Sequence, residues 1–156
     1  EAIVSALDSG RLSRSVTDFP SETIAEHQGV LAVPHLGAST EEAEENCAIM
    51  AADQLRRYLE EGTIVNSVNF PTCELAPTER QRILIANRNI PNMVGQITTI
   101  LANHSINILD LLNRHRGELA YNIIDIDGNL TAEAVDQLRA IDGVIFVRTI
   151  RPLMGS

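Results

Sequence analysis

The sequence predicts two structural units, an α/β unit toward the N-terminus and an α+β unit toward the C-terminus. Apolar residues make up 44% of the 156 residues, so the chain can bury a core, and aromatic residues contribute only 3%. The charge also changes along the chain. Residues 1–80 carry 14 acidic side chains and 5 arginines, whereas residues 81–156 carry 7 of each. Such a change indicates a boundary near residue 80.

The elements of the first part follow from short apolar runs and the residues that stop them. We expect a short helix, two short extended segments and a longer helix, at residues 1–7, 15–17, 30–33 and 40–61. Pro34 ends the second extended segment because proline cannot donate to a strand ladder. Ser39 and Glu42 form a capping box for the long helix. Gly62 is expected to end that helix.

Four glutamates crowd the start of the long helix, at positions 41, 42, 44 and 45. The positive end of the helix dipole stabilises acidic side chains there, and no other residues with ligand spacing converge on them. His104 and His115 likewise lack further ligands. The sequence therefore predicts no metal site.

The second part alternates between strand and helix patterns after a polar stretch at residues 72–80 that is typical of a linker. Strands are expected at residues 82–86, 106–114, 118–127 and 144–150, and helices at residues 93–104 and from Thr131 onward. The order β-α-β-β-α-β is that of the ferredoxin-like split fold. Because this fold leaves one sheet face without helices and one edge open, we expect a partner to cover both in a homodimer.

Composition excludes several function classes. A net charge of −9 argues against nucleic-acid binding, and the absence of lysine excludes Schiff-base chemistry within the chain. Cys47 and Cys73 match no redox or metal spacing, no signal peptide is visible, and no apolar stretch approaches ~20 residues. We therefore expect a cytoplasmic protein. Because Glu1 begins inside a helical pattern, we also expect a longer protein upstream.

Three stretches carry a specific family resemblance: Val16-Thr17-Asp18-Phe19-Pro20-Ser21-Glu22, Pro34 to Thr40, and Asn66-Ser67-Val68-Asn69-Phe70-Pro71. They resemble the D-3-phosphoglycerate dehydrogenases, NAD-dependent 2-hydroxyacid dehydrogenases that open the L-serine pathway. The resemblance implies that residues 1–71 are the end of a Rossmann-type nucleotide-binding domain plus a helix that returns to the substrate domain. Residues 81–156 resemble an ACT domain, an amino-acid-sensing module that allows allosteric regulation.

The resemblance also implies catalytic roles. It makes His35 the general acid/base and Glu22 the carboxylate that hydrogen-bonds it, and it places Asp18 and Gly37 near the cofactor. Imidazole, with an ordinary pKa of about 6.5, suits proton exchange with a substrate alcohol at neutral pH. The chain contains no G-x-G-x-x-G motif for NAD, so we expect it to be inactive by itself.

In serine-regulated relatives the ACT domains pair edge to edge and bind L-serine at the interface. The resemblance places Asn92, Gly95 and Asn107 at that site. An amide offers a zwitterion both a donor and an acceptor, and glycine allows close approach of the backbone. A ligand-free alternative is that Asn92 caps its helix and Asn107 satisfies a turn. The sequence does not specify the effector or decide between a dimer and a tetramer. It also leaves open two alternative functions, a non-catalytic amino-acid-binding module and a purely structural dimerisation module.

Overall fold

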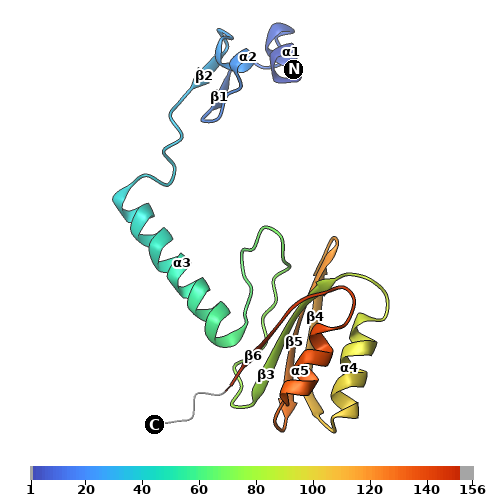
Figure 1. The fold of residues 1–156 in the computed structure, drawn as a ribbon. Helices are drawn as coiled ribbons and strands as arrows, with labels where there is room; N and C mark the ends of the chain where they lie inside the picture. Colours follow the sequence, from blue (N-terminus) through green and yellow to red (C-terminus); the bar gives the residue numbers. More distant parts are fainter. Residues whose placement is uncertain (1, 152–156) are drawn as a thin grey trace. The chain divides into compact units, whose positions relative to one another are not determined.

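The computed structural model describes residues 2–151, and its contacts divide the chain into a first unit ending at Ile49 and a second unit beginning at Met50 (Figure 1). The predicted helix start at Glu1 and the end of the predicted ACT domain, from Pro152 to Ser156, lie outside the described residues. Within the described range, no helix is both long and apolar enough to cross a membrane.

The first unit is built around a short parallel strand pair. Its elements are α1 (Ala2–Asp8), β1 (Ser15–Thr17), α2 (Glu22–Ala25), β2 (Val30–Ala32) and the first turns of α3 (Glu41–Glu61). β1 and β2 pair in parallel, from Ser15 opposite Val30 to Thr17 opposite Ala32. The single-turn helix α2 was not predicted, because four residues carry too little periodicity to be seen in a sequence. Two paired strands do not make a nucleotide-binding domain, so the Rossmann origin of this unit stays a prediction.

His27 ties the end of α1 to the start of β2, although the sequence indicated no role for it. The Gly29 N–H donates to Nδ1 of His27 over 2.9 Å, so the ring proton lies on Nε2, which is 3.1 Å from Oδ1 of Asp8. The Gly29 carbonyl in turn accepts from the Ser15 N–H over 2.9 Å. This polar bridge helps to hold α1 against both strands.

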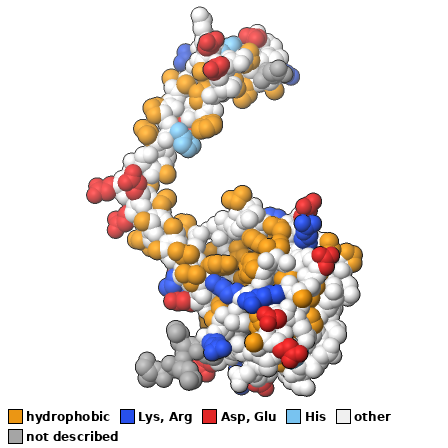
Figure 2. Space-filling view, in the orientation of Figure 1, with side chains coloured by type: hydrophobic (Ala, Val, Ile, Leu, Met, Phe, Trp, Pro, Cys, Tyr) orange, Lys and Arg blue, Asp and Glu red, His pale blue; other side chains and the backbone are white. Residues whose placement is uncertain are grey.

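The start of α3 differs by one residue from the prediction. The Ala43 N–H donates to Oγ1 of Thr40 over 3.2 Å, so Thr40 is the capping residue. The Ser39 N–H is engaged instead with the Leu36 carbonyl in the preceding turn. Acidic side chains gather over the first turns of α3, as the dipole argument predicts (Figure 2).

The second unit has the predicted β-α-β-β-α-β order. Its elements are β3 (Gln81–Arg88), α4 (Met93–Asn103), β4 (Asn107–Arg116), β5 (Leu119–Asp127), α5 (Ala132–Arg139) and β6 (Val144–Ile150). The strands form one antiparallel sheet in the order β4-β5-β3-β6, which is the ferredoxin-like arrangement. Gly117, with φ of 56°, makes the predicted turn between β4 and β5. Helices α4 and α5 lie on the same face of the sheet (Figure 1).

The face under the two helices is an aliphatic core. Alternate residues of β3 and β5 point toward α4 and α5, as the period of two in a strand requires. The buried members on this side include Ile83, Ile85, Ile97, Leu101, Ile124, Ile126 and Leu138. The low aromatic content predicted this kind of packing.

The opposite face of the sheet is covered by the chain itself, which differs from the expected cover by a partner. The covering segment, residues 62–77, lies against this face, and Cys73 is completely buried there. Ile64 and Cys73 form an antiparallel bridge with N–H···O distances of 2.8 and 2.9 Å. Four of the five aromatic side chains pack on this side, namely Tyr58, Phe70, Tyr121 and Phe146. Within the stretch predicted to be a linker, Cys73 is buried and Leu75 is partly buried, whereas most of the other side chains are exposed. The domain limits of 1–71, 72–80 and 81–156 stay a prediction.

Donors from the sheet hold the covering segment in place. Arg82, only 1% exposed, binds Asp125 through two bonds of 2.7 and 2.9 Å, and it also donates to the carbonyls of Glu61 (2.8 Å) and Ala76 (2.6 Å). The Tyr121 hydroxyl donates to the Gly62 carbonyl over 3.0 Å. Gly62 has φ of 75°, a left-handed conformation that glycine adopts without strain.

Candidate functional site

The first candidate site lies at the carboxyl ends of β1 and β2. Asp18 follows β1 directly and His35 follows β2 by three residues, so the parallel pairing brings them to the same edge. Nδ1 of His35 is 2.8 Å from Oδ2 of Asp18. The Val33 N–H donates to the Thr17 carbonyl over 3.0 Å, which keeps the two chains together beyond the strands. Ligands of open α/β sheets bind at such carboxyl ends.

Phe19 and the solvent complete the surroundings of the histidine. The Phe19 ring meets the His35 ring edge-on, with centroids 5.8 Å apart and an angle of 75° between the planes. The His35 side chain is 69% exposed. A carboxylate only accepts hydrogen bonds, so the neutral imidazole of His35 carries its proton on Nδ1. The lone pair of Nε2 can then accept a proton. The site can therefore exchange a proton through Nε2.

Glu22 is not brought to His35. It begins α2, and among the described residues no hydrogen bond joins it to the imidazole; the carboxylate that does so belongs to Asp18. Asp18 lies next to His35 because it directly follows β1, whereas Glu22 lies beyond Pro20 in the next helix. The catalytic role expected of Glu22 stays a prediction.

The residues expected near the cofactor do not form an NAD site by themselves. The carboxylate of Asp18 is engaged with His35. A Cβ added at Gly37 would meet nothing within 4 Å, so the described residues give that glycine no close neighbour. The expectation that NAD contacts this part of the chain stays a prediction.

The second candidate site surrounds the start of α4. Asn92 adopts a left-handed conformation with φ of 65° and makes no side-chain capping bond, so the alternative that it caps the helix is not observed. A Cβ added at Gly95 would lie 2.3 Å from Oδ1 of Asn92. Glycine is therefore needed at position 95 for the Asn92 amide to rest over the first helical turn.

A hollow of about 430 Å³ opens beside these two residues. Its walls are Asn92, Gly95, Gln96, Thr99, Ile100 and Ile141. Asn107 does not line it, because that residue starts the edge strand β4 opposite Asp127. The structure thus brings together two of the three predicted effector residues. Gln96 and Thr99 also line the hollow but were not predicted to do so. Their spacing of four and seven residues from Asn92 places them on one helix face.

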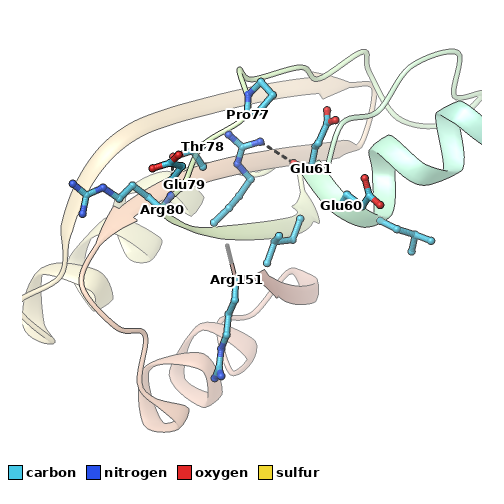
Figure 3. Close-up of a pocket in the computed structure, with 10 residues that line it drawn as sticks. Glu60, Glu61, Pro77, Thr78, Glu79, Arg80 and Arg151 are labelled. Atoms are coloured by element: carbon cyan, nitrogen blue, oxygen red, sulfur yellow. Dashed lines mark hydrogen bonds between the residues drawn. The ribbon is translucent and has the colours of Figure 1, made fainter. Parts of the chain in front are cut away.

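A second hollow, of about 470 Å³, lies between the end of α3 and the ends of β3 and β6 (Figure 3). Its charged lining is mixed, with Glu60, Glu61 and Glu79 beside Arg80 and Arg151. Arg80 is paired with Asp127 at 3.2 Å. This balance of charges selects no class of ligand.

The two cysteines differ in their surroundings. Cys47 is exposed on α3, and Cys73, in the covering segment, is buried against the sheet. Burial raises the pKa of the Cys73 thiol to about 11, because the thiolate would lose its hydration. Burial likewise raises the pKa of Tyr121. In the part of the chain that the structure describes, no cluster of three potential metal-ligating side chains is present.

Comparison with known proteins identifies relatives of nearly the whole chain. The chain is 30% identical to D-3-phosphoglycerate dehydrogenase of Escherichia coli (strain K12) over 162 aligned positions, which cover 96% of this chain and 40% of the relative. It is 32% identical to D-3-phosphoglycerate dehydrogenase 2 of Saccharomyces cerevisiae over 132 positions, covering 81% and 28% of the two chains. No family model matches the sequence.

Among solved structures, the ACT domain from GTP pyrophosphokinase of Chlorobium tepidum aligns with 47% of this chain and 100% of its own, at 22% identity and a TM-score of 0.41. The chain spans about 40% of the length of the bacterial dehydrogenases that it matches, and the matched region is their C-terminal part. The family resemblance seen in the sequence is therefore confirmed: this chain is a relative of the C-terminal part of the D-3-phosphoglycerate dehydrogenases.

Proposed function

We propose that this chain is the C-terminal part of an NAD-dependent D-3-phosphoglycerate dehydrogenase, which oxidises 3-phosphoglycerate to 3-phosphohydroxypyruvate in L-serine biosynthesis. The observation that carries the proposal is that a single alignment runs through both units, covering 96% of the chain but 40% of the relative. A protein that shared only an ACT module with these enzymes would align over the second unit alone.

In this proposal His35 exchanges the proton of the substrate alcohol. Its Nδ1 makes the hydrogen bond to Asp18, and among the described residues Nε2 has no hydrogen-bond partner. NAD would supply the hydride acceptor. Because the sequence lacks the glycine-rich phosphate loop, the binding of its phosphates is assigned to residues outside this chain.

The first unit and α3 then serve as the end of the nucleotide-binding domain and the helix that returns to the substrate domain. Two features support this assignment. The β1–β2 pair is parallel, as in nucleotide-binding folds. Apolar side chains on α3 are more than half exposed, among them Ile49, Leu55 and Leu59, which is typical of a surface that packs against another domain.

The second unit is proposed to sense an amino acid, with L-serine as the first candidate. The hollow beside Asn92 offers amide and hydroxyl groups next to the apolar side chains of Ile100 and Ile141. The covering segment already occupies the face of the sheet that carries no helices. β4 and β6 form the two edges of the sheet, so we expect a second copy of the chain to pair with one of these strands. Asn107 starts the edge strand β4, so in this proposal it joins a site that such pairing would complete.

The experiment is a dehydrogenase assay on the full-length protein that carries this chain. NADH formation from 3-phosphoglycerate should be lost by a factor of about 10²–10⁴ in His35→Gln, because a general base is removed. His115→Gln, on the exposed surface of β4, is the matched control and should retain activity. Absence of turnover by the wild-type full-length protein would overturn the proposal.

Calorimetry with L-serine tests the sensor separately on the chain as it stands. Binding that is lost in Asn107→Ala would support the regulatory role. If an amino acid binds while the full-length protein has no dehydrogenase activity, the chain is a non-catalytic amino-acid-binding module instead.

A further inference from the structure

We propose that Arg88, Arg114 and Arg116 form a binding site for a small phosphate monoester, on the sheet face that carries the covering segment. The inference does not rest on the proposed dehydrogenase function. These are three of the seven arginines between positions 81 and 156, and all three are exposed. Among the described residues none of the three forms an ion pair with a carboxylate, whereas other arginines of the second unit do.

The register of the sheet brings the three arginines together. Leu119 of β5 pairs with Arg88 on one side and with Arg116 on the other, and Arg114 pairs with Tyr121. Tyr121 is buried against the covering segment, so its cross-strand partner and the residues two positions away point to that same face. From the strand spacing, the Cα atoms of Arg88 and Arg116 lie about 10 Å apart, and those of Arg114 and Arg116 about 7 Å apart. Three long side chains at this spacing can converge on one anion.

The covering segment holds one of these guanidinium groups in place. Nη1 of Arg116 donates to the carbonyls of Ser67, over 2.8 Å, and Val68, over 3.2 Å. No described residue engages its Nε or Nη2. These donors form a planar fork that matches two oxygens of a phosphate group. Because the guanidinium is already oriented, binding costs less conformational entropy there.

Arg114 lies over the same face. Burial raises the pKa of the Cys73 thiol to about 11, and the positive charge of Arg114 acts in the opposite direction, which places its guanidinium near the buried thiol. Three cations this close repel one another, and no carboxylate of the described residues offsets the repulsion. A dianion offsets it better than a single carboxylate does, and its oxygens can accept from several guanidinium groups at once. The small area of the cluster suits a small ligand.

Titration of this chain with glycerol 2-phosphate, followed by NMR of the arginine Nε–H groups, tests the proposal. At about pH 7.5 a phosphate monoester is mainly a dianion, because its second pKa is about 6. At a constant ionic strength of about 0.15 M, the signals of all three arginines should shift together and saturate. Arg88→Gln and Arg114→Gln should each raise Kd by about three- to ten-fold, because each removes charge-assisted hydrogen bonds. Circular dichroism should show both variants folded, since both side chains are exposed.

Arg139→Gln is the matched control. It removes the same charge from the exposed surface of α5, on the opposite face of the sheet, and should leave Kd unchanged (Figure 1). An equal rise in Kd in Arg139→Gln would overturn the proposal, because binding would then follow net charge rather than position. Shifts that do not saturate would overturn the site. Acetate that binds as tightly as the ester would overturn the phosphate class, and tighter binding of a hexaglutamate peptide would overturn the choice of a small ligand.

Discussion

Replacing Arg82 with methionine is the most informative test of how the second unit is held together. Methionine keeps most of the buried volume but removes both bonds to Asp125 and the donors to Glu61 and Ala76. Asp125 is 5% exposed, so Arg82→Met leaves a buried carboxylate without its cation. Breaking one side of a buried pair costs about 3–5 kcal/mol. For a unit of this size that corresponds to a fall in Tm of more than about 12 °C.

Arg80→Met is the matched control for this experiment. Arg80 pairs with Asp127 at 3.2 Å near the same ends of β3 and β5, but both side chains are more than half exposed. An exposed pair contributes less than about 1 kcal/mol to the free energy of unfolding.

Urea unfolding followed by circular dichroism should therefore separate the two variants by at least about 2 kcal/mol. Arg82→Met/Asp125→Leu should recover part of the loss, because the unpaired charge is gone while the segment carbonyls still lack their donor. Equal stability of Arg82→Met and Arg80→Met would refute the view that the buried arginine anchors the covering segment.

Two further predictions concern the hollow beside α4 and the buried thiol. Gly95→Ala should raise the free energy of unfolding by up to about 1 kcal/mol, because alanine favours the helical conformation more than glycine does. The added Cβ should also displace the Asn92 side-chain amide. A loss of stability together with unchanged NMR signals of the Asn92 side chain would contradict this prediction. The pKa of the Cys73 thiol is about 11 in the folded protein and 9.0 in the unfolded chain. The free energy of unfolding should therefore fall as the pH rises from 9 to 11, and Cys73→Ala should reduce that fall in urea titrations. An identical fall in both proteins would contradict the proposed cause.

Local patterns along the chain were sufficient for the elements of the second unit. Alternating β-branched and aliphatic residues in β3 and β5 and the 3–4 spacing in α4 specify a strand or a helix from neighbours within a few positions. Gly117 marks the β4–β5 turn because its left-handed conformation is a property of the residue itself. The segment from Pro34 to Thr40 indicated the protein family for a related reason, because its residues follow one another in a short, specific order.

The partners of those residues were decided only by tertiary structure. Arg82 and Asp125 are 43 positions apart and meet because β3 and β5 pair in one register. Asp18 rather than Glu22 reaches His35 because a parallel pair of three-residue strands places the ends of β1 and β2 side by side. Periodicity specifies which face of an element is apolar, but not which distant element covers that face. For that physical reason, the chain's own segment over the sheet could not be foreseen from the sequence, and a partner was expected in its place.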